Sequence, residues 1–169
     1  MDRNARLIRL YERVYSRTSL VCALKAVGKV SVLAVALTFI SACIYVGVSC
    51  GVVECVRFAL STVIPFTVVS VMRALFDFKR PYEVIDFPHF AALRRERKAG
   101  KSFPSRHVFS AFTIGALMLS VSPILGVVVL TLGAFLAVER VLLGIHFARD
   151  VLAGAIIGLL SGIVGILFL

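Results

Sequence analysis

The chain has 169 residues, of which 60% are hydrophobic, and its mean hydropathy is +0.99. Its 19 Lys and Arg residues outnumber its 9 Asp and Glu residues, but the charges lie between long apolar runs and form no soluble basic face. This composition excludes an ordinary soluble globular protein and argues against nucleic acid as a partner. It predicts an all-α, multi-pass transmembrane bundle surrounded by membrane lipids.

The first 29 residues predict a basic amphipathic helix. One broad face contains Leu7, Ile8, Leu10, Tyr11, Val14 and Tyr15, and the rest carries Arg3, Arg6, Arg9, Arg13 and Arg17. This pattern is typical of a helix that lies along the membrane surface, or that packs under the spanning bundle. We therefore divide the chain into this helix (1–29) and a transmembrane domain (30–169).

About five membrane spans are predicted in the transmembrane domain. Residues 30–53 carry no charge, and Pro65 predicts a kink in the second span. The uncharged run 108–138 is too long for one span at about 1.5 Å per residue, so it predicts two helices that meet at Ser122-Pro123. Ser102 is the predicted N-cap of the third span, with Pro104 in the first turn. The predicted spans are 30–50, 56–75, 102–120, 123–140 and 145–169.

The charges also predict how the bundle is oriented. The N-terminal segment and the loop 77–102 are strongly basic, whereas the connections near residues 54 and 122 are almost neutral. Basic connections favour the cytoplasmic side, so the N-terminus and the loop are expected there, on a cell membrane. The loop supports this orientation even without the arginines of the candidate site, through Arg94, Arg95, Arg97, Lys98 and Lys101.

A set of polar residues at the ends of the apolar helices is not explained by orientation alone. Odd-numbered spans leave the basic side and even-numbered spans return to it, so these residues are expected to meet at one level. Ionisable groups in such positions are costly unless they are paired or functional. The set comprises Arg73, Arg80, Ser105, His107, Glu139, Arg140, His146 and Asp150.

The spacing of His146 and Asp150 predicts that they share one helix face. Asp150 would then accept one ring N–H and leave the other ring nitrogen as a basic lone pair, as a nucleophile needs. The alternative is a histidine that a carboxylate satisfies for packing. Each arginine alone is most simply a positive-inside anchor, but three converging arginines suit a tetrahedral anion.

The first turn of the third span offers further groups to such an anion. The hydroxyl of Ser105 and the free backbone N–H groups of that turn are donors, and the helix dipole there favours a negative charge. His107 either caps the interface or, beside a bound phosphate, donates a proton to a leaving oxygen.

Three short segments together resemble the signature of a known family. They are Arg73-x6-Arg80-Pro81, Pro104-Ser105-Arg106-His107 and Arg140-x5-His146-x3-Asp150. In order, spacing and membrane placement they resemble the type 2 phosphatidic acid phosphatase (lipid phosphate phosphatase) superfamily, in its membrane-bound branch. The run from His146 to Gly154 is similar to that family's third motif and its following helix, and the resemblance covers residues 73 to about 158.

The resemblance implies an integral membrane phosphatase that hydrolyses a lipid phosphate or diphosphate through a phosphohistidine intermediate. His146 would be the nucleophile, Asp150 would orient it, and His107 would protonate the leaving group and later activate water. No metal and no other cofactor is expected, because arginines take the charge-neutralising task of Mg²⁺. Phosphatidate, phosphatidylglycerol phosphate and polyprenyl diphosphates all stay open as substrates. The groups implied to bind phosphate are Arg73, Arg80, Ser105, Arg140 and the backbone N–H of Arg106.

Three positions depart from the family's usual pattern. Arg73 stands in place of the usual lysine, Arg106 in place of a glycine, and Glu139 in place of a serine. The five predicted spans are also one fewer than the six-helix bundle usual in the family. Two alternatives remain open, namely transfer of phosphate from lipid to lipid and a catalytically silent lipid-binding scaffold. The joint presence of His107, His146 and Asp150 favours an enzyme over the scaffold.

Overall fold

The computed structural model describes residues 3–97 and 99–168, with the side chains of Arg3 and Asn4 left aside. Within these ranges the chain forms helices and no strands. Four residues lie outside the described ranges. They are the first two residues of the predicted surface helix, Lys98 of the predicted basic loop and the last residue of the fifth span. The helices are α1 (Arg3–Tyr15), α2 (Thr18–Cys50), α3 (Val52–Leu75), α4 (Pro81–Val84), α5 (Phe90–Glu96), α6 (Arg106–Val121), α7 (Pro123–Leu142) and α8 (Ala148–Leu167).

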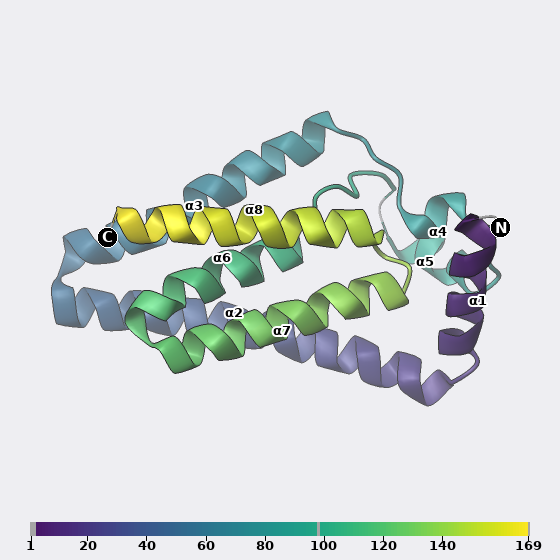
Figure 1. Ribbon diagram of the computed structural model, residues 1–169, viewed down its shortest axis with the longest axis horizontal. Coiled ribbons are helices and arrows are strands. Elements are labelled where there is room, and N and C mark those ends of the chain that lie inside the picture. The colour runs from purple at the N-terminus through teal and green to yellow at the C-terminus, as the bar shows by residue number, and fades with distance from the viewer. Residues whose placement is uncertain (1–2, 98, 169) are drawn as a thin grey trace.

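The five long helices form one elongated bundle, as Figure 1 shows. By length and composition, four of them can cross a membrane, namely α2, α3, α7 and α8, and α6 is a shorter apolar helix. The predicted all-α membrane bundle is therefore confirmed. The third predicted span is shorter than expected because α6 begins at Arg106, with Ser105 and not Ser102 in the N-cap position. Pro104 consequently precedes the helix.

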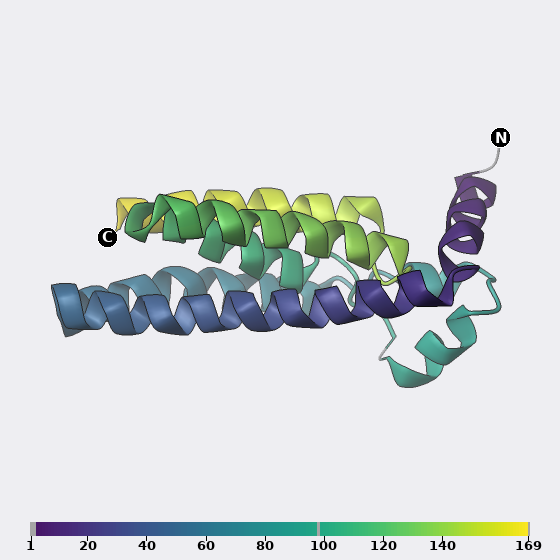
Figure 2. The same ribbon diagram turned by 90° about the horizontal axis from the view of Figure 1, so that it is seen from below.

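α6 is the central helix of the bundle. It packs against α8 and α7 most extensively and also against α2 and α3. Figure 2 shows α6 between the layer of α7 and α8 and the layer of α2 and α3. Its buried residues include Phe109, Ala111, Leu117 and Met118. Because neighbouring helices cover it, its backbone and side chains need no direct match to the lipid around the bundle.

A row of glycines lets α8 approach α6 closely. A Cβ at Gly154 would lie 2.7 Å from the carbonyl oxygen of Ser105, and one at Gly158 would lie 2.5 Å from that of Phe109. Gly162 faces Ala116 in the same way, at 2.5 Å. Small residues spaced four apart are the usual means of close packing between membrane helices. The row starts one turn after Asp150, so it also fixes that residue beside the start of α6.

The N-terminal segment differs from its predicted extent. α1 ends at Tyr15, and α2 begins at Thr18 and continues without interruption to Cys50. The helix predicted for residues 1–29 is therefore two elements. The uncharged run that begins at residue 30 suggested a boundary there, but the exposed Lys25 and Lys29 do not interrupt a helix that carries apolar residues on its other sides.

α1 runs across one end of the bundle (Figure 2), where it packs on α4 and α5. Tyr11 and Val14 are buried, as the amphipathic pattern predicts, while Arg6, Arg13 and Arg17 are exposed. An aromatic and aliphatic cluster joins the three helices. It consists of Tyr11, Tyr82, Ile85, Phe87, Phe90 and Leu93.

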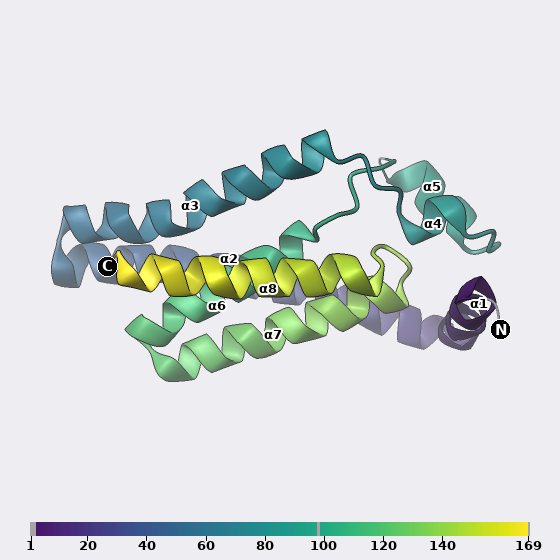
Figure 3. The same cartoon turned by 45° about the horizontal axis from the view of Figure 1, so that its top comes forward.

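The helix ends that carry the polar set lie at this same end of the bundle. The C-termini of α3 and α7 and the N-termini of α6 and α8 gather there, beside α1, α4 and α5 (Figure 3). The short α2–α3 and α6–α7 connections, at Gly51 and Ser122, lie at the other end (Figure 1). The predicted convergence at one level is therefore present in the structure.

The close α6–α8 contact leads to a first prediction. Gly158→Ala should lower the free energy of unfolding by about 1–3 kcal/mol, because the added methyl group meets backbone with no room to yield. Gly47→Ala is the matched control, since its Cβ would make an ordinary 3.4 Å contact with Cys55. Thermal unfolding in detergent, followed by circular dichroism, measures both. Equal stability of the two variants would contradict the assigned packing.

Candidate active site

His146 lies in the loop between α7 and α8, and its backbone is held from within the loop. The N–H groups of Ile145 and His146 both donate to the carbonyl of Arg140, at 2.9 and 3.1 Å. Gly144 has φ +68°, a left-handed conformation that glycine adopts without strain. A Cβ at Gly144 would also overlap the ring of Phe90 on α5. The turn that presents His146 therefore depends on glycine for two reasons.

Two side chains from other elements also form hydrogen bonds to the backbone of this loop. The hydroxyl of Tyr15, on α1, donates to the carbonyl of Leu143 at 3.1 Å. Burial raises the pKa of Tyr15 to about 12, which keeps this hydroxyl protonated as a donor. The guanidinium of Arg80 reaches the carbonyl of Ile145 at 3.5 Å. Helix α1 thus contributes directly to the position of the loop, a contact that its amphipathic pattern did not indicate.

Ser102 connects His146 to Asp150. The Oγ of Ser102 donates to Oδ2 of Asp150 at 2.5 Å and lies 3.3 Å from Nδ1 of His146. Nδ1 itself lies 3.6 Å from Oδ2, within ion-pair range but longer than a hydrogen bond. Because the hydroxyl of Ser102 already donates its hydrogen bond to Asp150, its oxygen is free to accept one from Nδ1–H of His146. The predicted His146–Asp150 pair is therefore present, with a serine between its members.

Asp150 is fully buried and is held on several sides. Its Oδ2 also accepts the backbone N–H of Phe147 at 3.0 Å, and Nε of Arg149 lies 3.5 Å from Oδ1. Its backbone carbonyl accepts the N–H of Ser105 at 2.9 Å. One residue thus links the start of α8, the start of α6 and the His146 loop.

The surroundings of His146 favour its neutral form. The residue is 3% exposed, and this burial lowers the pKa of His146 to about 4. The carboxylate of Asp150 offsets part of this effect, while the charges of Arg80 and Arg73 add to it. Since Nδ1 faces the Ser102 oxygen, a neutral ring carries its proton there. The lone pair is then on Nε2, which is the form a nucleophile requires.

Arg73 and Arg80 organise the loop that leads into α6. The guanidinium of Arg73 donates to the carbonyls of Lys101, Ser102 and Pro104, the second at 3.2 Å. Nε of Arg80 donates to the carbonyl of Gly100 at 3.0 Å. Both cations therefore lie beside the loop that carries Ser102 and Ser105.

Glu83 secures the same loop from α4. Its carboxylate accepts the backbone N–H of Gly100 at 3.0 Å and that of Arg80 at 2.7 Å. This joins the two ends of the long polar connection between α3 and α6. Sequence reasoning identified neither Glu83 nor the bridging role of Ser102, because both depend on backbone contacts between distant residues.

Arg140 and Glu139 form a buried pair at the end of α7. Nε of Arg140 lies 3.2 Å from Oε2 of Glu139, and the two residues are 8% and 4% exposed. Gly28 on α2 makes room for the carboxylate, since a Cβ there would lie 2.7 Å from Oε1. The pair lacks the geometry of a hydrogen bond at these two atoms. Nε of Arg140 is thus left without a hydrogen-bond partner among the described residues.

The first turn of α6 offers donors without protein partners. The Oγ of Ser105 is buried and, among the described residues, has no hydrogen-bond partner. The N–H groups at the start of a helix are likewise free by position. Such a turn is suited to an anion. His107 and Arg106, in the same turn, are exposed and line a cavity of about 320 Å³ with residues of α2, α3 and α7.

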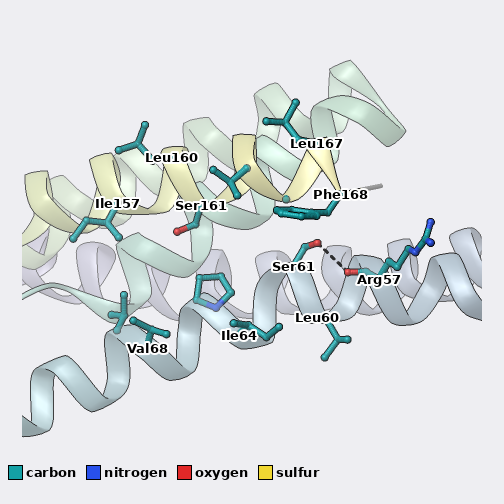
Figure 4. A pocket seen from close by; sticks show the side chains of 14 residues that line it. Arg57, Leu60, Ser61, Ile64, Val68, Ile157, Leu160, Ser161, Leu167 and Phe168 are labelled. Atoms are coloured by element: carbon teal, nitrogen blue, oxygen red, sulfur yellow. Dashed lines mark hydrogen bonds between the residues drawn. The ribbon is translucent and has the colours of Figure 1, made fainter.

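A larger cavity of about 900 Å³ lies between α3 and α8, away from these residues. Figure 4 shows its apolar walls, with Ile64, Val68, Ile157 and Leu160 from the two helices and Arg57 near one end. It contains none of the predicted site residues. Its size alone does not make it the reaction site.

The structure therefore unites most of the predicted site residues around one loop cluster. His146, Asp150 and Ser105 are linked through hydrogen bonds, Arg73 and Arg80 bind the adjoining backbone, and Arg140 supplies the carbonyl that holds His146. His107 and Arg106 face the adjacent cavity. Within the part of the chain that the structure describes, no cluster of three or more His, Cys, Asp or Glu side chains is arranged to hold a metal ion.

The neutral state of His146 is a testable consequence of its burial. In ¹⁵N-histidine NMR spectra of the protein in detergent, His146 should stay neutral, with its proton on Nδ1, until the pH falls to about 4. An ordinary exposed histidine would gain its proton near pH 6.5. The chain has only three histidines, so His89→Asn and His107→Asn variants assign the signals. A His146 titration above pH 6 would contradict the described environment.

Comparison with known proteins agrees with this fold. The solved structure of LpxE from Aquifex aeolicus is similar, with a TM-score of 0.67, 20% identity, and coverage of 95% of this chain and 94% of that one. A transmembrane PAP2 type phosphatidylglycerolphosphate phosphatase from Bacillus subtilis matches with a TM-score of 0.51 and 18% identity, over 99% of this chain and 96% of that one. At these identities the two structures support the fold.

Two curated proteins match over shorter stretches. The chain is 36% identical to a lipid A 1-phosphatase from Porphyromonas gingivalis over 80 residues, which is 45% of this chain and 18% of that protein. It is 35% identical to the bacitracin transport permease protein BcrC from Bacillus licheniformis over 68 residues, 40% of this chain and 34% of that protein. The chain thus matches about a third or less of the length of each relative.

The PAP2 superfamily matches residues 54–169, which include all three motifs and every predicted site residue. This match covers well over half of the chain, and the two solved structures share its membrane-bound helical fold. The chain therefore belongs to the PAP2 superfamily, whose members are lipid phosphatases, and to its membrane-bound branch.

Proposed function

We propose that this protein is an integral membrane phosphatase that hydrolyses a lipid phosphate or diphosphate through a phosphohistidine on His146. The observation that carries the proposal is the buried ring of His146, with Nδ1 3.3 Å from Ser102 Oγ and that hydroxyl 2.5 Å from Asp150. A histidine so held has its lone pair on Nε2. Packing alone does not require a buried carboxylate, a serine bridge and a glycine turn around one imidazole.

The reaction proceeds in two displacements. In the first, Nε2 of His146 attacks phosphorus, and the bond from phosphorus to the leaving oxygen breaks with its electron pair on that oxygen. His107 donates the proton that the oxygen takes up. In the second, His107 removes a proton from water, whose oxygen attacks phosphorus. The N–P bond breaks, its electron pair returns to Nε2, and inorganic phosphate leaves. Asp150 stabilises the positive ring in both steps through its contact with Ser102.

The phosphate is held by positive charge and by donors at the start of α6. Arg73, Arg80 and Arg140 supply the charge, and Ser105 Oγ and the N–H of Arg106 supply hydrogen bonds. The buried, unpartnered hydroxyl of Ser105 supports this role, because such a group is costly unless a ligand satisfies it. Arg73 acts chiefly through its charge and its hold on the loop, since its guanidinium already donates to three carbonyls.

Three arginines together neutralise the charge of the transferred phosphoryl group, which is the task that metal ions perform in many other phosphoryl-transfer enzymes. We therefore propose that hydrolysis needs no metal. The buried Glu139 weakens the contribution of Arg140, because it lies 3.2 Å from the same guanidinium. Phosphate binding consequently depends more on Arg80 and on α6 than it would with a serine at this position.

Phosphate release by the purified protein in detergent tests the function. Release from a panel of phosphatidate, phosphatidylglycerol phosphate and a polyprenyl diphosphate should persist in EDTA. His146→Ala should reduce it by at least about a thousandfold, because the nucleophile is lost. Loss of release in EDTA would overturn the metal-free step. No release from any lipid, by protein with a normal circular dichroism spectrum, would favour a silent scaffold or a phosphotransferase that lacks its acceptor.

The proposed location of the site is the cytoplasmic side of a cell membrane. In a background with its four cysteines replaced by serine, Arg95→Cys on α5 should react with an impermeant maleimide only after cells are opened. Val52→Cys, at the opposite end of the bundle and 76% exposed, is the matched control and should react in intact cells. The reverse labelling pattern would place the active site on the outer face.

A further inference from the structure

Arg106 presents a cation that the protein itself does not neutralise. It is exposed at the first turn of α6, and its guanidinium lies over the ring of Phe66, 6.0 Å from the ring centre. Among the described residues no carboxylate lies within 4.0 Å of it, and every ion pair found there involves other residues. An arginine beside apolar membrane helices is costly unless an anion accompanies it. The side chain of Arg106 is therefore available to an anion from outside the protein.

The cavity beside Arg106 is otherwise mostly apolar. Its volume is about 320 Å³, within the range of small-molecule sites. Its polar side chains are those of Arg106, His107 and Ser110, all on α6. The rest of the lining comes from four helices and consists of Val32, Val35, Ala36, Phe66, Ile114 and Leu136. A ligand in this cavity would therefore combine an anionic group near α6 with hydrocarbon beyond it.

His107 relates this cavity to the reaction. In the proposed mechanism His107 protonates the leaving oxygen, so the leaving group lies on the His107 side of the transferred phosphorus. Whatever follows that oxygen in the substrate must then extend past His107 and Arg106. In a lipid monophosphate the next atoms are uncharged. In a lipid diphosphate the next group is a second phosphate, which carries at least one negative charge.

We propose that the side chain of Arg106 is a second anion subsite, which binds the phosphate retained by the leaving group and makes a lipid diphosphate the preferred substrate. This inference rests on the proposed function, because it uses His107 to define the leaving-group side. Nε2 of His146 attacks the distal phosphorus, and the bond from that phosphorus to the bridging oxygen breaks. The bridging oxygen takes the electron pair and the proton from His107, and becomes a terminal oxygen of the lipid monophosphate. Arg106 binds the negative charge that this retained phosphate carries on its other oxygens.

This role is distinct from that of the Arg106 backbone. The backbone N–H belongs to the proposed cradle of the transferred phosphoryl group, and any residue other than proline supplies it. The side chain reaches away from that cradle, toward Phe66 on α3. A glycine at this position would keep the first group and lack the second. The side chain is therefore a determinant of which lipid is used, rather than of whether phosphate is released.

The test compares two substrates that share one hydrocarbon chain, farnesyl diphosphate and farnesyl monophosphate. The ratio of kcat/KM for the diphosphate to kcat/KM for the monophosphate should fall roughly tenfold or more in Arg106→Gln, the effect of losing one charge-assisted hydrogen bond. Arg106→Lys, which keeps the charge, should restore much of the ratio. Arg95→Gln removes one equal charge on α5, outside the site, and should leave the ratio unchanged.

A second readout avoids turnover. In the His146→Ala background, Arg106→Gln should weaken binding of farnesyl diphosphate, measured by calorimetry in detergent, more than binding of the monophosphate. An unchanged ratio, or an equal loss with both substrates, would overturn the subsite while His146-dependent release still upheld the proposed function. Absence of His146-dependent release from either substrate, by folded protein, would overturn both.

Discussion

Asp150 is the constraint on which the rest of the site depends. A fully buried carboxylate is expensive, and here it is stabilised by the hydroxyl of Ser102, the N–H of Phe147 and a nearby guanidinium from Arg149. Phe147 and Arg149 belong to the start of α8 itself, whereas Ser102 comes from a distant loop that must be in place. The glycine row on α8 brings Asp150 against α6, and Arg73 holds the loop that delivers Ser102. The same contacts therefore pack the bundle and position the residues of the candidate site.

The bundle itself could be predicted from the sequence because its main signals are local. Uncharged runs mark most of α2, α6, α7 and α8, and the Ser122-Pro123 step separates α6 from α7 where it was expected. The start of α2 was missed, since the apolar pattern continues past Lys25 and Lys29 and charge alone marks no helix end. The start of α6 was misplaced by a few residues, because Ser102 and Ser105 are equally good N-caps by residue type. Only the contact between Ser105 and Asp150 decides between them.

For the site, residue types and spacing predicted the ionisable groups but not the groups that position them. The helical spacing of His146 and Asp150 paired them correctly, although the helix predicted to carry both was wrong for His146, which lies in the loop before α8. Ser102 precedes that pair by more than forty residues, Tyr15 lies far earlier on α1, and Glu83 acts only on backbone N–H groups. Their roles depend on contacts between residues that lie far apart in the sequence. No local sequence pattern indicates such contacts. The sequence showed the charge of Glu139, but it did not show that Gly28 on α2 leaves space for the Glu139 carboxylate.

The length of α6 has a consequence for the depth of the chemistry. A helix of 16 residues is about 24 Å long, whereas the hydrocarbon core of a bilayer is about 30 Å thick. If its far end is level with the neighbouring helices, His107 lies about 6 Å beneath the surface of the hydrocarbon. A lipid would then reach the site by lowering its headgroup a short way, with its chains still immersed. Every methylene that stays immersed avoids a penalty of about 0.8 kcal/mol in water. The central helix, by stopping short, would place the proposed site within reach of the lipid.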